Sequence, residues 1–311
     1  MKSLSTVFVV FTLLLHCSIS LRSQNDANIS TNDSTADCDV TKEFLSGELN
    51  FIKHLITNEE FENTIETRLN LKLNCPTFID IKDSIHYFSG WSGYRLKKLD
   101  FAISELLQVS ETSPFYVKSQ FYSSFCYAFD GDNKNAIQTL AEIPIEINNL
   151  ELMNIKNLQL AGTYLLERDY QNYSKSLNQL DTNNYLIKNE TERLKYHRSS
   201  LQKIKNKSQF LAGLFSAVIP GSGKFYAGYK GQAIAAAIPT ILFGAVATEQ
   251  YFKSGPKSFQ FISFASLFSI FYVGNIWGSV ISVRTYRDDI NNKIDNGILV
   301  DMHIPLRRFF D

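Results

Sequence analysis

Two long uncharged runs near the carboxyl end constrain this chain more than any other feature of its sequence. Residues 231–252 contain one charged side chain, Glu249, and residues 258–283 contain none. Because a helix rises 1.5 Å per residue, each run is long enough to cross a hydrocarbon core of about 30 Å. Soluble domains rarely carry two such runs in succession. The sequence therefore predicts a transmembrane helical hairpin with spans at about 231–252 and 258–283.

The amino terminus is typical of an export signal. Lys2 supplies a positive end, a short apolar core follows, and small residues at 18–20 offer a cleavage site. We expect a signal peptide over residues 1–20, with an uncleaved anchor or a lipoprotein processed at Cys17 as the alternatives. Residues 21–40 are rich in Ser, Thr, Asn and Asp, which predicts a disordered spacer.

Export would place the remaining cysteines, Cys38, Cys75 and Cys126, in an oxidising compartment. Cys38 with Cys75 is the candidate disulfide, although spacing fixes no connectivity. The alternative is that Cys75 and Cys126 are small buried thiols. No Cys/His spacing suggests a metal site, and no cofactor is predicted.

The overall charge of zero conceals an asymmetry. Residues 1–200 contain 19 Lys and Arg against 25 Asp and Glu, whereas residues 201–311 contain 12 against 6. Binding to nucleic acid needs a basic surface on the soluble part, and here that part is acidic. The charge distribution therefore argues against nucleic acid as a partner.

Four segments share a local pattern at a near-constant interval. Their aligned positions are Thr64, Ala102, Ala136 and Tyr173. These positions are 38, 34 and 37 residues apart, a spacing that suits a helix–turn–helix repeat. No segment alternates apolar and polar residues for long enough to require a sheet, so we expect an all-α fold.

The repeat resembles the tetratricopeptide repeat family. Pro76 and Pro114 each follow an aligned position by twelve residues, where the family has a terminal proline, and Gly90 stands at the family's small first-helix position. The resemblance implies an array of α-α hairpins over residues 41–182, in which small residues permit close packing and prolines end the second helices. Two aligned residues are not the family's alanine, and an irregular α-helical bundle is the alternative.

The remaining segments complete the expected organisation. Residues 183–208 carry charges at three- and four-residue spacing, which predicts a solvated helical stalk. Residues 209–290 form the membrane module, in which 210–219 is too short to span and predicts an interfacial or re-entrant helix. Residues 291–311 are expected to be a polar tail. Two crossings are favoured, and a third at 209–223 is the alternative.

A turn marked by glycine and tyrosine precedes the first span. The residues that carry it are Pro220, Gly221, Gly223, Tyr226, Gly228 and Gly231. The pattern resembles a two-helix membrane domain that follows tetratricopeptide-like repeats in some bacterial envelope proteins. This resemblance implies a bacterial inner-membrane protein with an extracytoplasmic, periplasmic repeat domain. It implies no activity, because that family is largely uncharacterised.

No catalytic site emerges from the sequence. The stretch from Gly221 to Lys224 differs from a phosphate-binding loop, because Val218 replaces the required first glycine and Phe225 replaces the required Ser or Thr. The five histidines are scattered, and none has the spacing to a nucleophile or carboxylate that catalysis would need. We therefore expect a protein that is not an enzyme.

The principal hypothesis is a membrane-anchored scaffold of the cell envelope that binds a protein or peptide through its repeats. Membrane lipid is the second expected partner, and self-association is left open. The alternative is that the membrane module acts as an accessory to transport or to membrane-protein insertion. The scarcity of charge within the spans disfavours transport, because ion pathways usually contain ionisable residues.

Overall fold

The computed structural model describes residues 41–73, 77–144, 149–181 and 184–310. These residues belong to one compact unit, Val40–Asp311. The expected signal peptide, the spacer, Cys38, Cys75 and Pro76 lie outside the described residues. The Cys38–Cys75 disulfide and the helix-ending role of Pro76 therefore stay predictions.

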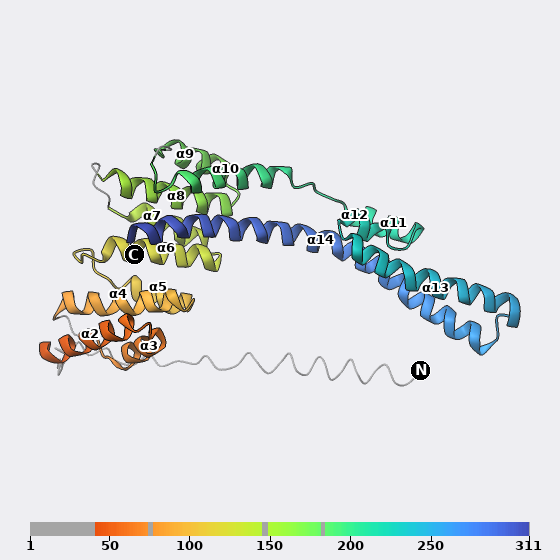
Figure 1. Ribbon diagram of the computed structural model, residues 1–311, viewed down its shortest axis with the longest axis horizontal. Helices are drawn as coiled ribbons and strands as arrows, with labels where there is room; N and C mark the ends of the chain where they lie inside the picture. Colours follow the sequence, from red (N-terminus) through yellow and green to blue (C-terminus); the bar gives the residue numbers. More distant parts are fainter. Residues whose placement is uncertain (1–40, 74–76, 145–148, 182–183, 311) are drawn as a thin grey trace, which may run out of the picture. The chain divides into compact units, whose positions relative to one another are not determined.

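The described residues form thirteen α-helices and no strand, which confirms the expected all-α class (Figure 1). The first eight helices pair into four consecutive hairpins. They are α2 (Lys42–Thr57) with α3 (Phe61–Asn70), α4 (Ile79–Arg95) with α5 (Leu99–Leu106), α6 (Tyr116–Asp130) with α7 (Asn133–Glu142), and α8 (Leu150–Leu166) with α9 (Tyr170–Asn178). This succession of α-α hairpins agrees with the tetratricopeptide-like arrangement expected for this part of the chain.

The turn inside each hairpin repeats with the period seen in the sequence. Each turn has one residue with left-handed backbone, five positions before the aligned residue. These residues are Glu59, Lys97, Gly131 and Arg168, with φ of 60°, 58°, 92° and 63°. In each case the next N–H bonds back to a carbonyl in the last turn of the first helix, as Asp132 does to Tyr127 at 2.9 Å. The interval of 38, 34 and 37 residues therefore reflects one turn geometry repeated four times.

We expect Glu59→Gly to stabilise the array by about 1 kcal/mol. Glu59 is exposed and adopts a left-handed conformation that disfavours every residue with a Cβ atom. The reciprocal change, Gly131→Ala, meets no atom within 4 Å of the added Cβ but should destabilise the array by a similar amount. Urea unfolding of both variants measures the two effects. Changes of the same sign in both would contradict the role of the turn.

The predicted packing residues occupy the helix–helix contacts of the array. Thr64, Ala102 and Ala136 are fully buried, and Tyr173 is buried as well. A Cβ atom on Gly90 would lie 2.7 Å from Leu106 Cγ, so only glycine allows α4 and α5 to approach this closely. These residues are near the starts of the second helices, except for Gly90, which is on the first helix as expected.

The role predicted for Pro114 was wrong. Helix α5 ends at Leu106, and Pro114 lies in the turn that precedes α6. The intervening loop is held by Asp83, whose carboxylate accepts hydrogen bonds from the backbone N–H and the hydroxyl of Ser110. Helix α5 therefore ends well before Pro114, and this proline does not terminate it.

Four further helices carry the apolar part of the chain. They are α11 (Gln209–Val218), α12 (Ser222–Ala227), α13 (Lys230–Ser254) and α14 (Phe259–Phe310). Helix α13 and the first half of α14 are long and apolar enough to cross a membrane, and they coincide with the two expected spans. Only 17% and 11% of their apolar windows are buried, so neither resembles the core helix of a soluble protein. Helix α11 is too short to span, as expected.

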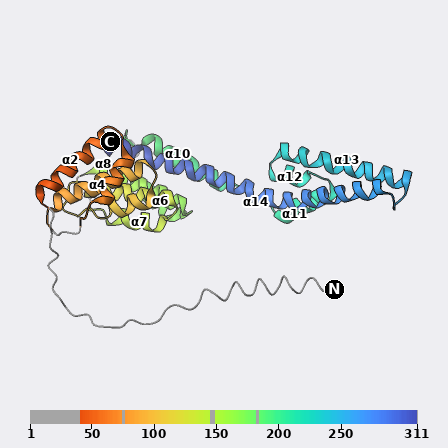
Figure 2. The ribbon, with the colours of Figure 1, turned by 90° about the horizontal axis from the view of Figure 1, so that it is seen from below.

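The polar tail expected over residues 291–311 was wrong, and the stalk expected over 183–208 contains the expected helix, α10, but one face of that helix is buried. Helix α14 continues without interruption to Phe310 and packs against α6, α8 and α10 (Lys188–Lys203). Figures 1 and 2 both show its carboxyl-terminal half beside α10. Helix α10 buries Thr191, Leu194 and Leu201. The cause is a hydrophobic stripe on each helix, which average polarity conceals.

Candidate functional site

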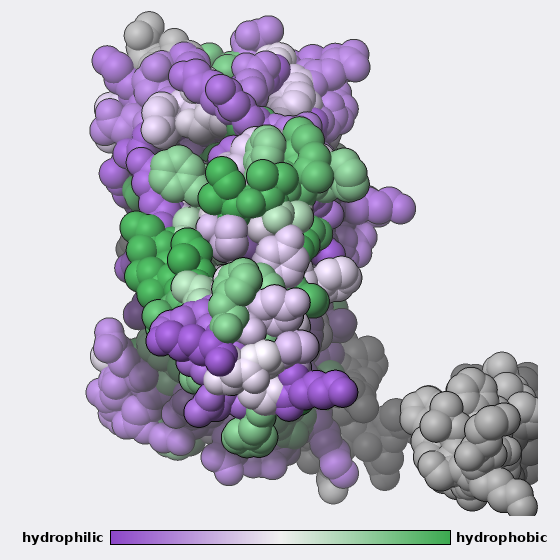
Figure 3. Space-filling view, turned by 90° about the vertical axis from the view of Figure 1, so that its right-hand side faces the viewer, coloured by the Kyte–Doolittle hydropathy of each residue, from purple (hydrophilic) through white to green (hydrophobic). Residues whose placement is uncertain are grey.

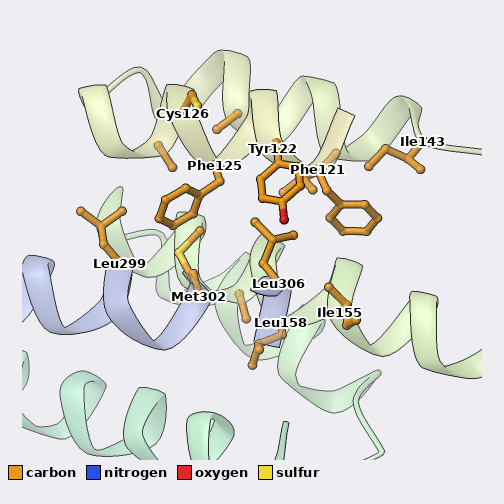
Figure 4. Packing of buried hydrophobic residues seen from close by; sticks show 14 of the residues in the cluster. Phe121, Tyr122, Phe125, Cys126, Ile143, Ile155, Leu158, Leu299, Met302 and Leu306 are labelled. Carbon is orange, nitrogen blue, oxygen red and sulfur yellow. The ribbon is translucent and has the colours of Figure 1, made fainter. Parts of the chain in front are cut away.

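The carboxyl-terminal half of α14 lies in the core of the repeat array. Ile298, Met302 and Leu306 are fully buried, and their four-residue spacing places them on one face of the helix. In Figure 4, Leu299, Met302 and Leu306 point towards Phe121, Tyr122 and Phe125 of α6, with Leu158 of α8 nearby. We refer to residues 291–310 as the docking segment. It contributes Ile298, Leu299, Met302 and Leu306 to the main hydrophobic core.

Helix α8 is shaped to receive the docking segment. A Cβ atom on Gly162 would lie 2.4 Å from Met302 Cγ, so the methionine uses the space that glycine leaves. The Gln159 amide donates a 2.5 Å hydrogen bond to the carbonyl of Met302. Pro305 has no N–H, so the carbonyl four residues before it, that of Asp301, loses its helical donor. The glutamine bond lies one residue further on and ties α8 to the same turn of α14.

Charged pairs fix the docking segment against α10 and against the turn between α8 and α9. The buried Asp301 carboxylate accepts from Arg193 Nε at 2.5 Å and pairs with His197 Nε2 at 3.0 Å. Burial opposes the charge on Arg193, but Asp301 and Glu190 outweigh it and raise the pKa of this guanidinium. A second pair is bidentate: Arg168 donates to both oxygens of Asp295 at 2.8 and 3.0 Å. Arg168 is also the left-handed residue of the last hairpin turn.

The docking segment lies along the first helices of the hairpins. Besides α6 and α8 it reaches α4, where the Tyr94 hydroxyl bonds to His303. At its end, the Lys118 ammonium donates to the carbonyl of Phe310. The principal hypothesis assigned partner binding to the repeats, and this part of their surface is filled by the chain itself. Apolar residues at every fourth position, from Ile294 to Phe310, were a signal that the sequence analysis missed.

An open cavity of 520 Å³ remains where the docking segment meets α4 and α6. Its apolar lining includes Phe125 and the half-exposed Phe129 of α6, with Leu299 and Val300 of the docking segment. The basic residues Arg95, Lys97 and Arg307 also line it. Arg95 stacks on the ring of Trp91, and Lys97 lies over that of Phe129. A lining that combines apolar and basic side chains suits an apolar segment that carries negative charge.

The glycine-marked turn is a tightly packed element of the membrane module. Gly221 and Gly228 have φ of 88° and 121°, which L side chains rarely adopt. A Cβ atom on Gly223 would lie 1.9 Å from the carbonyl oxygen of Ala212 in α11. Pro220 lies in the turn between α11 and α12. Gly231 differs, because a Cβ atom there meets nothing within 4 Å.

Helix α14 clamps this turn with buried polar groups. The Asn275 side chain accepts from the N–H of Gly221 at 3.0 Å and donates to the carbonyl of Ser216 at 3.2 Å. The Ser216 hydroxyl bonds to Ser279 at 2.6 Å and accepts from the N–H of Gly223 at 2.9 Å. These bonds satisfy backbone groups that a helix break would otherwise leave unpaired in an apolar region. The network therefore has a structural explanation.

Two tyrosines bond the glycine-marked turn to neighbouring parts of the chain. The Tyr226 hydroxyl accepts from the N–H of Ser208 at 3.2 Å. The Tyr229 hydroxyl donates to Asp289 at 2.6 Å, and its ring lies against Tyr286. Tyr226 and Tyr229 thus connect the turn to the linker after α10 and to α14.

Cys126 is fully buried in α6. This agrees with the interpretation of Cys126 as a small buried thiol. Burial raises the pKa of its thiol to about 12, from an ordinary value of 9.0. The protonated thiol therefore stabilises the fold below pH 9, and this contribution declines as the pH rises towards 12.

We expect Cys126 to resist alkylation in the folded protein. In a variant with the other cysteines replaced by serine, iodoacetamide should react more than about 100-fold faster in urea than in buffer at pH 8, because only unfolding exposes the thiolate. Mass spectrometry of timed samples measures the ratio. Equal rates in the two solvents would show that α6 does not bury this residue.

The described residues contain no group of His, Cys, Asp and Glu able to hold a metal ion. Two of the histidines contact carboxylates on neighbouring helices. His86 and Arg68 both contact Glu105, at 2.9 and 2.6 Å, which connects the first two hairpins, and His197 contacts Asp301. Comparisons with protein-family models, with curated proteins and with solved structures found no match for this chain.

Proposed function

We propose that this protein is a non-catalytic, membrane-anchored scaffold of the cell envelope that holds a helical-repeat domain at the membrane surface for a protein or peptide partner. The observation that carries the proposal is the single helix α14. Its first half exposes apolar side chains, and its second half is part of the core of the repeats. The membrane hairpin and the repeat domain share helix α14. No flexible linker therefore separates them, and the helix holds the repeat domain at the membrane.

Exposed apolar side chains support insertion of the hairpin. They include Ile234, Ile238 and Ile241 on α13, and Ile262, Ile270 and Trp277 on α14. Hydrophobic residues gather in the centre of the face drawn in Figure 3, which is viewed from the side where the hairpin lies in Figure 1. Soluble monomers rarely expose so large an apolar surface, and a hydrocarbon core would cover it.

Packing of the docking segment supports two crossings. A segment in the core of the repeats must lie on the same side of the membrane as the repeats, so the chain between them crosses an even number of times. The expected export signal places that side outside the cytoplasm. In this topology the loop around Lys257 is cytoplasmic, whereas Lys188 and Lys293 are both external.

Labelling with a membrane-impermeant maleimide tests this topology. Single cysteines replace Lys188, Lys293 or Lys257, all exposed, in a chain without its other cysteines. In sealed cells we expect the first two positions to react and the third to react only after permeabilisation. Reaction of Lys188→Cys and Lys293→Cys from opposite sides would refute the two-crossing arrangement. Solubility of the whole chain without detergent would refute membrane anchoring itself.

Partner binding is proposed at the open cavity beside Phe129. The buried amide of Asn275 is already occupied by hydrogen bonds to Gly221 and Ser216, which favours a structural role for it over a transport role. A photo-crosslinking residue at Phe129 in the full-length chain should give one discrete product in native membranes. A second variant, Arg95→Gln, changes an exposed lining residue and should weaken the product, and a crosslinker at the exposed Tyr185 serves as the control position. Products of equal yield at both positions would refute a specific site.

A further inference from the structure

A cavity of 820 Å³ lies where the end of α10 and the linker after it pass beside the middle of α14. Its lining contains five basic side chains and no acidic one. The basic residues are Lys203, Lys205, Lys207, Arg284 and Arg287. They come from two segments that are far apart in the sequence. A topological signal needs basic residues only on one side of the membrane, whereas these residues surround one concave space.

The cavity is positioned at the end of the apolar surface. Val283 is the last residue of the uncharged run in α14, and Arg284 is the first charge after it. Val283 and Phe210 both line the cavity. From Phe210 the exposed apolar residues of α11 continue with Leu214 and Val218. Basic groups beside an apolar surface match the boundary between lipid headgroups and hydrocarbon.

The positive charge of this cavity is poorly compensated. Lys203 and Lys205 are exposed and have no ion-pair partner among the described residues. Arg284 and Arg287 share one exposed carboxylate, Asp288, at 3.7 and 3.9 Å. Such long, exposed pairs contribute little, so an anion that entered the cavity would meet an unneutralised field.

Lys207 has a different role. Its ammonium donates to the carbonyl of Ala227 at 3.0 Å and lies over the rings of Tyr226 and Tyr286. Lys207 therefore has a structural role next to the glycine-marked turn. The other basic residues of the cavity are the ones available to bind a ligand.

We propose that this cavity binds the headgroup of an anionic phospholipid. Lys203, Lys205 and Arg284 hold the phosphate group, for which a guanidinium offers paired donors. The acyl chains lie along the exposed apolar side chains of α11 and α14. The inference rests on the membrane anchoring proposed above, and it adds a defined lipid site at which the repeat domain meets the membrane surface.

The test uses full-length protein reconstituted into vesicles and, separately, solubilised in a neutral detergent. Binding of a short-chain phosphatidylglycerol to the solubilised protein is measured by its effect on the melting temperature. We expect a concentration-dependent rise with phosphatidylglycerol and none with phosphatidylcholine. The double variant Lys203→Gln/Lys205→Gln should weaken the apparent affinity about 25-fold, since each surface cation contributes roughly fivefold.

The matched control is Lys134→Gln/Lys188→Gln, which removes the same charge from exposed positions on α7 and α10 that do not line the cavity. This control should bind like the wild type. Equal affinity for both lipids, or equal loss in both double variants, would overturn the site. A full response to glycerol phosphate at the same concentration would assign the cavity to free phosphate compounds and overturn the lipid assignment. Failure of the wild type to enter vesicles of either lipid would instead refute membrane anchoring.

Discussion

Replacing Leu306 by alanine is expected to destabilise the repeat array by about 2–5 kcal/mol, although this residue lies near the carboxyl end. Leu306 is fully buried in the core that α6 and α8 form with the docking segment. Removal of its side chain loses the transfer free energy of the buried atoms and leaves a cavity between three helices. Urea unfolding can be followed through Trp91, which packs in the array, in a Trp277→Phe background.

Val300→Ala is the matched control for this prediction. Val300 belongs to the same helix but is half-exposed, so its truncation should change the free energy of unfolding by no more than about 0.5 kcal/mol. If Leu306→Ala and Val300→Ala had equal small effects, the docking segment would not belong to the core. The inference that both ends of the membrane hairpin lie on one side would then lose its basis.

The second large effect is expected at the glycine-marked turn. In Gly223→Ala the new Cβ atom would lie 1.9 Å from the Ala212 carbonyl oxygen, and the contacting atom is backbone that cannot rotate away. Helices α11 and α12 must separate, which also breaks the bond from the N–H of Gly223 to Ser216. We expect a loss of at least about 3 kcal/mol, the upper range for overpacking.

Gly231→Ala separates the packing requirement from the motif as a whole. Its Cβ atom meets nothing within 4 Å, and alanine is a better helix former at the start of α13. The melting temperature in detergent should therefore fall for Gly223→Ala and stay constant or rise for Gly231→Ala. An equal fall in both variants would show that the motif glycines act through something other than the contacts described above.

Much of the fold followed from local patterns. The 38-, 34- and 37-residue intervals located all four hairpin turns, because each turn needs a left-handed residue followed by the start of a helix. The two apolar spans were located by length and charge alone. The glycine motif was identified from spacing, but the sequence could not distinguish Gly223, which packs against backbone, from Gly231, which does not.

The two candidate binding cavities could not be predicted from the sequence. The cavity beside Phe129 and the basic cavity near Val283 both combine segments that are distant in the chain. Pro114 has the expected spacing from Ala102, yet α5 ends at Leu106 and the loop after it bonds to Asp83 through Ser110. A contact of this kind has no signature in either segment read alone.

The sequence by itself determined an all-helical chain, a repeated hairpin and an apolar pair of helices, because helix periodicity, turn geometry and hydrocarbon thickness act on neighbouring residues. Only the tertiary structure decided that residues 291–310 complete the repeat array. Their charges, such as Asp295 and Asp301, make the segment look solvated until Arg168, Arg193 and His197 are brought beside it. Whether a mixed polar and apolar helix is a tail or part of a core depends on the surface that receives it.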